Sequence, residues 1–299
     1  MIPEFPKFKK LELTDRKDIE KFTSQFPHYS DFNFISMWSW DIHNKIRISK
    51  LNNNLVVIFN DYLSGENFLS FIGDKNIIET TSKLITLSEK KYKKSFLKLI
   101  PEEVLLKYKG SSFSAKSDRD SCDYIYLTED LIDMKNWRQN DHARRIRKFT
   151  TTYPDYIVKV SSMKEILPSE YKKIFRRWSE DKNTPDVFES NEYKAFERFL
   201  KLNDKNNKFI SVYINNELIG FSVYEFLSDR YAIAHFSKAN NKQYPAIYDL
   251  LNWEESKFCH SQGVKHLNWE QDLGIPGLRY SKEKYKPYFL MKKLIVSRV

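Results

Sequence analysis

The segment from Asn268 to Tyr285, which reads NWEQDLGIPGLRYSKEKY, combines acids, bases, aromatic residues and two of the chain's seven glycines. Glu270 and Asp272 alternate at the end of a predicted strand, so we expect their side chains to point the same way. Such a pair of carboxylates can orient or deprotonate an amine or a hydroxyl group. Cations placed close by can stabilise an oxyanion or hold a phosphate ester. Three cations follow the carboxylates: Arg279, Lys282 and Lys284. We therefore take this segment as the candidate catalytic site.

His235 lies near the end of a predicted strand and, in this order of elements, faces the same end of the sheet as the two carboxylates. It is a candidate catalytic base. Substrate binding is predicted for five further residues: Lys238, Asn268, Lys282, Lys284 and Tyr285. The alternative is a structural role, in which the charged residues form a salt-bridge cluster and the histidine is a hydrogen-bonded core residue.

The segment from Lys135 to Lys148 holds six cations against a single acid, Asp141. On a helix, Arg144, Arg147 and Lys148 share one face, which suits the phosphates of RNA or of a phospholipid headgroup. We assign this contact to Arg144 and Arg145. A solvated basic helix without a partner is the alternative.

Hydrophobic periodicity in the second half predicts two helices before a three-stranded meander, and then a helix and a returning strand. The predicted ranges are a strand at 156–160, helices at 168–182 and around 193–200, strands at 209–214, 218–226 and 231–236, a helix between 245 and 263, and a strand at 264–269. Asn215–Asn216 and Ser228–Asp229 are suitable tight-turn pairs between the meander strands. A short helix follows the returning strand.

The first half repeats this order, which indicates a duplication. Its predicted ranges are helices at 14–26 and 31–40, strands near 45–49, 55–60 and 68–72, a helix at 76–91 and a strand near 96–100. A meander followed by a strand–helix–strand crossover is typical of the GNAT (N-acetyltransferase) superfamily. The sequence therefore predicts an α+β chain with a tandem GNAT-like acyltransferase fold, two acetyltransferase-like repeats packed together. Strand 123–127 is expected to close the first repeat, which places the domains at 1–133 and 134–299, with the site in the second.

The formal charge of +10 favours a polyanionic partner, either a nucleic acid or an anionic lipid surface. Cys122 and Cys259 lack CxxC spacing, and His260 and His266 add no suitable ligand spacing, so no disulfide and no metal site are expected. No window approaches the roughly 18 consecutive apolar residues of a membrane span. We expect no transmembrane segment and a cytoplasmic protein that can also contact the inner membrane surface peripherally.

Acetyltransferases that use coenzyme A hold its pyrophosphate with a glycine-rich turn after the meander, because glycine lets backbone amides approach phosphate. The equivalent turn here, Ser237 to Ala246, contains no glycine, and Pro245 removes one amide donor. Backbone binding of pyrophosphate is therefore disfavoured, and no cofactor is expected. Coenzyme A stays open as an alternative donor, held through the side chains of Lys238 and Lys242.

The block NWEQDLGIPGLRYSKEKYKP strongly resembles the C-terminal domain family of phosphatidylglycerol lysyltransferase. In that family an N-x-E-x-D-L-G-x-x-G-L-R motif leads into a K-x-K/S-Y/F-x-P segment. Further similarity is found at Phe26–Trp40, Asp123–Leu131 and His235–Ala239, so the resemblance covers nearly the whole chain. The family is described as a tandem acetyltransferase-like fold related to the Fem-type peptidyl transferases.

The resemblance implies transfer of an aminoacyl group from aminoacyl-tRNA to a lipid headgroup hydroxyl or to a peptide amine. By that logic Glu270 and Asp272 orient the acceptor, and the cations on the short helix contact phosphate and the oxyanion. Two other function classes stay open: an acyl-CoA-dependent N-acyltransferase, and a non-catalytic RNA- or membrane-binding protein on the same fold.

Overall fold

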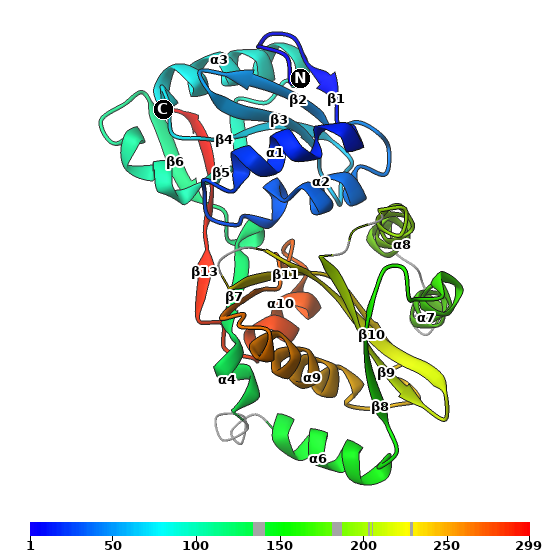
Figure 1. The fold of residues 1–299 in the computed structure, drawn as a ribbon. Helices are drawn as coiled ribbons and strands as arrows, with labels where there is room; N and C mark the ends of the chain where they lie inside the picture. Colours follow the sequence, from blue (N-terminus) through cyan, green and yellow to red (C-terminus); the bar gives the residue numbers. More distant parts are fainter. Residues whose placement is uncertain (134–140, 181–186, 203, 205, 228–229) are drawn as a thin grey trace. The chain divides into compact units, whose positions relative to one another are not determined.

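The computed structural model describes residues 1–133, 141–180, 187–202, 204, 206–227 and 230–299 (Figure 1). The chain forms two compact units. Unit 1 comprises Met1–Asp123, Glu197–Phe199 and Met291–Val299, and unit 2 comprises Tyr124–Phe196 and Leu200–Leu290. Both ends of the chain therefore belong to unit 1. Lys135 and Arg138 of the basic segment and the turn pair Ser228–Asp229 lie outside the described residues.

Unit 1 contains the meander predicted for the first half. Helices α1 (Arg16–Thr23) and α2 (Phe34–Trp40) precede strands β2 (Arg47–Leu51), β3 (Asn54–Asn60) and β4 (Asn67–Ile72), and the short strand β1 (Lys9–Lys10) pairs with β2. Helix α3 (Ile77–Tyr92) leads to β5 (Phe96–Pro101), which forms a separate sheet with β6 (Phe113–Ser117) and β14 (Lys293–Arg298). Asn52 and Asn53 are both left-handed (φ 52° and 59°), as a tight turn between β2 and β3 requires.

The core of unit 1 forms where α3 covers the sheet. Leu84 and Ile85 of α3 belong to one apolar cluster with Val56 of β3, and Leu294 and Val296 of β14 complete it. All five side chains are at most 1% exposed. Strand β14 comes from the last residues of the given sequence, so the core of unit 1 joins segments that are far apart in the chain.

Unit 2 is built on a sheet that has the order β13-β7-β12-β11-β10-β9-β8 within the described ranges. Its strands are β7 (Asp123–Leu127), β8 (Ile157–Ser162), β9 (Asn207–Ile214), β10 (Glu217–Phe226), β11 (Tyr231–Ala239), β12 (His266–Asn268) and β13 (Phe289–Met291). The helices are α4 (Thr128–Ile132), α6 (His142–Thr152), α7 (Pro168–Glu180), α8 (Val187–Phe199), α9 (Ile247–Ser261) and α10 (Pro276–Glu283). Strand β12 is parallel to β11, since helix α9 supplies the crossover between them.

Helices cover both faces of the sheet in unit 2 (Figure 1). Helix α9 lies on one face and contributes the buried side chains of Leu250 and Leu251. Helices α7 and α8 lie on the other face, where the rings of Phe175 and Phe196 are 6.0 and 5.5 Å from that of Phe221 on β10. The central strands β9, β10 and β11 are therefore largely buried on both sides, and a polar side chain in them needs a polar partner.

The strands that end the two halves are exchanged between the units. Strand β7 follows β6 in sequence, yet it pairs antiparallel with β12 in the sheet of unit 2, whereas β6 pairs with β14. In the second half, β13 stays in the sheet of unit 2, while β14 pairs with β5 and β6 in unit 1. The prediction that strand 123–127 closes the first repeat is therefore wrong. By its contacts, unit 2 begins at Tyr124.

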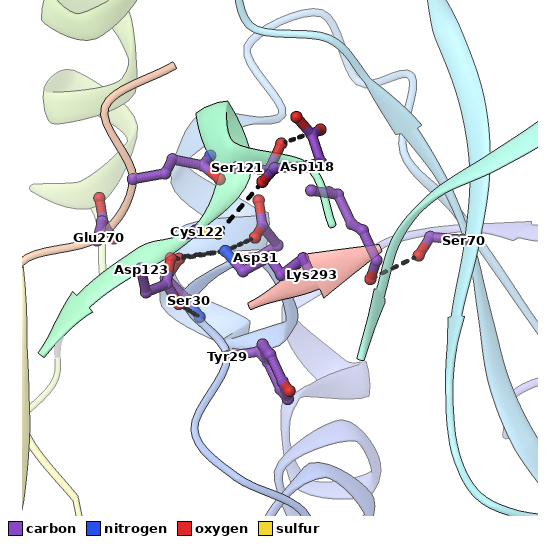
Figure 2. Close-up of polar contacts among 12 residues, drawn as sticks. Tyr29, Ser30, Asp31, Ser70, Asp118, Ser121, Cys122, Asp123, Glu270 and Lys293 are labelled. Atoms are coloured by element: carbon purple, nitrogen blue, oxygen red, sulfur yellow. Dashed lines mark hydrogen bonds and ion pairs between the residues drawn. The ribbon is translucent and has the colours of Figure 1, made fainter. Parts of the chain in front are cut away.

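A buried ion cluster holds β14 in unit 1 (Figure 2). Lys293, the first residue of β14, is fully buried, and its Nζ donates to Asp123 at 2.6 Å and also to Asp31. Ser30 donates its amide (2.8 Å) and its hydroxyl (2.6 Å) to Asp123. Burial disfavours the charged amine, but the two carboxylates outweigh this and raise the pKa of Lys293 above its usual value.

The other predicted elements are found within a few residues of their expected limits, including both meanders, the helices that follow them and the short helix after β12. Across the described ranges, no helix combines the length and apolar character needed to cross a membrane.

Candidate functional site

The segment after β12 bends in a tight turn, although Trp269 and Glu270 still form backbone hydrogen bonds with Tyr124 of β7. Strand β12 ends at Asn268, and Glu270 and Leu273 both have left-handed backbone (φ 55° and 56°). The Asn268 side-chain oxygen accepts the amide of Glu270 at 2.7 Å and stabilises this turn. The prediction that Glu270 and Asp272 alternate on a strand and point the same way is therefore wrong. Asp272 is fully buried, whereas the Glu270 side chain is 20% exposed.

The Asp272 carboxylate is the centre of a group of internal hydrogen bonds. Its carboxylate accepts two hydrogen bonds from Arg279, both at 2.9 Å. It also accepts the Tyr124 hydroxyl at 2.6 Å and the Gly274 amide at 2.8 Å. Burial would raise the pKa of Asp272, but these bonds outweigh it and hold that pKa at about 2. Asp272 thus ties β7 and α10 to the turn, which is the structural alternative considered for this segment.

The other predicted binding residues of the segment also have internal contacts. Lys282 Nζ donates to two backbone carbonyls of the turn, one of them at 2.7 Å. The Tyr285 hydroxyl donates to Asp249 at 2.6 Å, and Lys284 Nζ lies 3.7 Å from the same carboxylate. Much of the charge that marks the segment in sequence therefore serves to fold it.

A second group of charges, the histidine cluster, consists of Glu225, His235 and Glu270. His235 lies at a bulge, where the register between β10 and β11 shifts. Its Nε2 is 3.2 Å from a Glu225 oxygen, and its Nδ1 is 3.6 Å from a Glu270 oxygen. The pairing of β11 with β12 ends at Ile233, so the cluster lies where these two strands have separated.

The histidine cluster holds a proton at neutral pH. Burial would lower the pKa of His235, but the contacts with Glu225 and Glu270 outweigh burial and raise it to about 9. A protonated imidazole cannot accept a proton, so the role of base predicted for His235 does not fit this state. The side chains of His235 and Glu225 are 2% and 3% exposed, against 20% for Glu270. Glu270 is thus the member that a bound molecule can reach.

The stability of unit 2 should depend on the charge of His235. Because the folded-state pKa of about 9 exceeds the unfolded value of about 6.5, the stabilisation is fully present below about pH 6.5 and is lost as pH rises through 9. Relative to His235→Gln, the wild-type free energy of unfolding should fall by about 2 kcal/mol between pH 7 and pH 9. Urea unfolding across this range measures it. His43→Gln, at an exposed position, should follow the wild-type profile. If the difference in unfolding free energy between wild type and His235→Gln did not change with pH, the His235 imidazole would be neutral.

Lys238 lies on the face of β11 that α7 and α8 cover. Its Nζ donates to Glu192 at 2.8 Å and lies 4.0 Å from the centre of the Trp178 ring, and its side chain is 8% exposed. The structure thus places the charge of Lys238, predicted to bind phosphate, against helices α7 and α8.

Helix α6 buries one face and exposes a basic one. The buried residues are His142, Ala143, Ile146 and Phe149. Arg147 and Lys148 are exposed, and the Arg144 side chain is 78% exposed. Arg145 is 2.9 Å from Asp249 and still 46% exposed. The exposed face of α6 therefore offers cations within one or two turns, a spacing that suits successive phosphates.

Asp249 of α9 connects α6 with the end of the candidate segment. The His142 Nδ1 atom is 2.6 Å from its carboxylate, and the His142 ring stacks on Tyr285 at 4.5 Å. Burial would raise the pKa of Asp249, but the hydrogen bonds from His142 and Tyr285 and the nearby cations outweigh burial and lower this pKa. Sequence reasoning missed Asp249, Glu225 and Tyr124, because the group that each contacts lies on another element of the fold. Of the three, only Tyr124 lies in a stretch that resembles the family.

These features define a class: a chain of mixed helices and sheets with two acetyltransferase-like repeats. The family described as "Phosphatidylglycerol lysyltransferase, C-terminal" matches residues 23–296, and the chain belongs to this family. The resemblance and the tandem GNAT-like fold predicted from the sequence are thereby confirmed. Family and fold together indicate an acyltransferase.

Solved structures share the fold over nearly the whole chain. A conserved protein of unknown function from Bacteroides thetaiotaomicron has a TM-score of 0.80 at 23% identity and covers 100% of both chains. L-PGS from Bacillus licheniformis has a TM-score of 0.61 at 12% identity (100% of this chain, 94% of that chain). FemX has a TM-score of 0.59 at 10% identity and covers 97% of each chain. An uncharacterized protein of Mycoplasmoides gallisepticum is 24% identical over 178 residues, which span 59% of this chain and 56% of that protein.

Proposed function

We propose that this protein transfers an aminoacyl group from aminoacyl-tRNA to an acceptor, either a lipid headgroup hydroxyl or a peptide amine. The observation that carries the proposal is the histidine cluster, in which the partly exposed carboxylate of Glu270 is backed by the buried, protonated His235. It lies where β11 and β12 separate, in a chain that belongs to the lysyltransferase family. A carboxylate held in this way can orient an amine or hydroxyl for attack.

The transfer requires one bond to form and one to break. The acceptor nitrogen or oxygen attacks the carbonyl carbon of the aminoacyl ester, and its proton passes to Glu270. The bond between that carbon and the ribose oxygen of the tRNA then breaks, and the ribose oxygen takes up the proton, so the carboxylate is restored. His235 keeps Glu270 oriented through its Nδ1 atom, and Glu225 holds His235 from the other side.

Binding of the aminoacyl-tRNA donor would give a role to the basic face of α6. Arg144, Arg147 and Lys148 project from this helix, and phosphates of a folded RNA are the anions that such a row of cations suits best. Asp249 holds α6 against the end of the segment that carries Glu270. A cytoplasmic location, with peripheral contact at the inner membrane surface when the acceptor is a lipid, belongs to the same proposal.

Incubation with a mixed pool of charged tRNAs and an extract of cell lipids and peptides tests the proposal. Mass spectrometry should detect new aminoacyl adducts, and their masses identify donor and acceptor together. Glu270→Gln should lower the rate about a hundredfold, because the amide cannot accept the acceptor's proton. Glu283→Gln, the same change at an exposed position of α10, should retain wild-type activity.

Three results would overturn the proposal. Saturable binding of coenzyme A with no affinity for charged tRNA would indicate an acyl-CoA-dependent N-acyltransferase. Binding of charged tRNA without any adduct would indicate a non-catalytic RNA-binding protein. Wild-type transfer by Glu270→Gln would place the reaction elsewhere in the molecule.

A further inference from the structure

A chain of hydrogen bonds crosses the α9 face of the sheet in unit 2. Glu255 of α9, which is 2% exposed, accepts the Tyr224 hydroxyl at 2.6 Å, and that hydroxyl oxygen accepts the indole N–H of Trp269 at 2.8 Å. The indole is also packed against two aromatic rings, those of Tyr126 at 4.2 Å and Tyr285 at 5.3 Å. Trp269 is therefore held on several sides, and the hydrogen bond sets its position relative to β10.

Each carboxylate of the histidine cluster directly follows a member of this chain in sequence. Glu225 follows Tyr224, and Glu270 follows Trp269. Successive side chains of a strand point to opposite faces, so Tyr224 points toward α9 while Glu225 points toward His235. The left-handed backbone of Glu270 directs its side chain to the same histidine. The bond between Tyr224 and Trp269 thus links the two backbone segments that carry the carboxylates.

We propose that Glu255 is a positioning residue for the histidine cluster and acts through Tyr224 and Trp269. By accepting the tyrosine hydroxyl hydrogen, Glu255 leaves the hydroxyl oxygen directed at the indole N–H. Without this acceptor the hydroxyl turns elsewhere, the indole loses its partner, and the turn that carries Glu270 moves relative to His235. The consequence for aminoacyl transfer rests on the proposed function, whereas the effect on the histidine cluster does not.

The surroundings of Glu255 support this role. Burial raises the pKa of Glu255 to about 7, although the hydroxyls of Ser222 and Tyr224 oppose the shift. The groups that lower its pKa are therefore hydroxyls and not cations, and Cys259, one turn further along α9, is buried beside it. A leucine would pack in this core without burying a polar group. The buried carboxyl group of Glu255 therefore costs stability, and we infer that its contribution is the hydrogen bond it accepts from Tyr224.

The pKa of His235 reports the geometry of the cluster, because it depends on both carboxylates. In NMR titrations of histidine-labelled protein, with the His235 signal assigned from His235→Gln, the wild-type value should lie near 9. Glu255→Leu and Tyr224→Phe should each lower it by about one unit or more toward the ordinary 6.5. Glu255→Gln keeps an acceptor for the hydroxyl and should retain the wild-type value. In the transfer assay, Glu255→Leu should lower kcat with little change in KM for tRNA. Glu255→Gln should retain the wild-type kcat.

Glu254→Leu is the matched control. Glu254 precedes Glu255 on α9 and also accepts a tyrosine hydroxyl, that of Tyr156 at 2.9 Å, but this bond leads away from the cluster. The variant should lose stability without changing the pKa of His235. The proposal is overturned if Glu255→Leu leaves the pKa of His235 unchanged. If Glu255→Leu does not fold, Tyr224→Phe provides the same test. The titration needs no transfer activity, so its result stands even if no aminoacyl adduct is ever found.

Discussion

Replacing Lys293 with methionine should lower the free energy of unfolding of unit 1 by about 3–5 kcal/mol, because it leaves two fully buried carboxylates without their cation. The ammonium group donates to Asp31 and Asp123 within unit 1 (Figure 2). Urea unfolding measures the loss. Hydrogen exchange should show it first in β14, since this strand joins its sheet from the far end of the chain.

The neighbouring lysine is a matched control for this prediction. Lys292 pairs with Glu102 at 3.0 Å, but its side chain is 52% exposed, so Lys292→Met should change stability by about 0.5 kcal/mol or less. Changing Asp31 and Asp123 to Asn in the Lys293→Met background should recover part of the loss, because the unpaired charges are then gone. Equal stability of the two single lysine variants would contradict a stabilising ion cluster.

Asp272→Asn should destabilise unit 2 by about 3 kcal/mol and also abolish the proposed aminoacyl transfer. The change keeps the shape of the side chain but removes the anion that Arg279 and the Tyr124 hydroxyl hold. The folded-state pKa of about 2 is below the unfolded value of about 3.9. The stabilisation is thus complete above about pH 4 and is lost as pH falls through 2. The difference in unfolding free energy between wild type and variant should therefore shrink as pH is lowered from 5 to 3.

Asp130→Asn, at an exposed position of α4, should change stability by less than about 0.5 kcal/mol. The result for Asp272→Asn then distinguishes a role on the substrate from a role in holding the turn. If it unfolds like wild type but forms no product, Asp272 acts on the substrate, as first inferred from the sequence. If stability and activity fall together, it acts by holding the turn.

The special turn at 268–285 was predictable from sequence, whereas the contacts of its side chains were only partly so. Scarce glycines and dense charge correctly marked 268–285 as a special turn. The pairing of Glu270 with Asp272 failed, because the left-handed backbone at Glu270 breaks the alternation that two nearby carboxylates would have on a strand. Glu225 carries no local signal, since a lone glutamate in a strand shows its importance only through its neighbour His235.

The order of elements, the repeat and the family were determined by the sequence itself, because hydrophobic periodicity and local motifs act over a few residues. The partners of β7 and β14 were decided by the tertiary structure. A strand's period is the same in either sheet, and the choice depends on distant contacts such as those of Lys293 with Asp31 and Asp123. The charge of His235 was also decided there, because its pKa depends on two carboxylates that only folding brings to it.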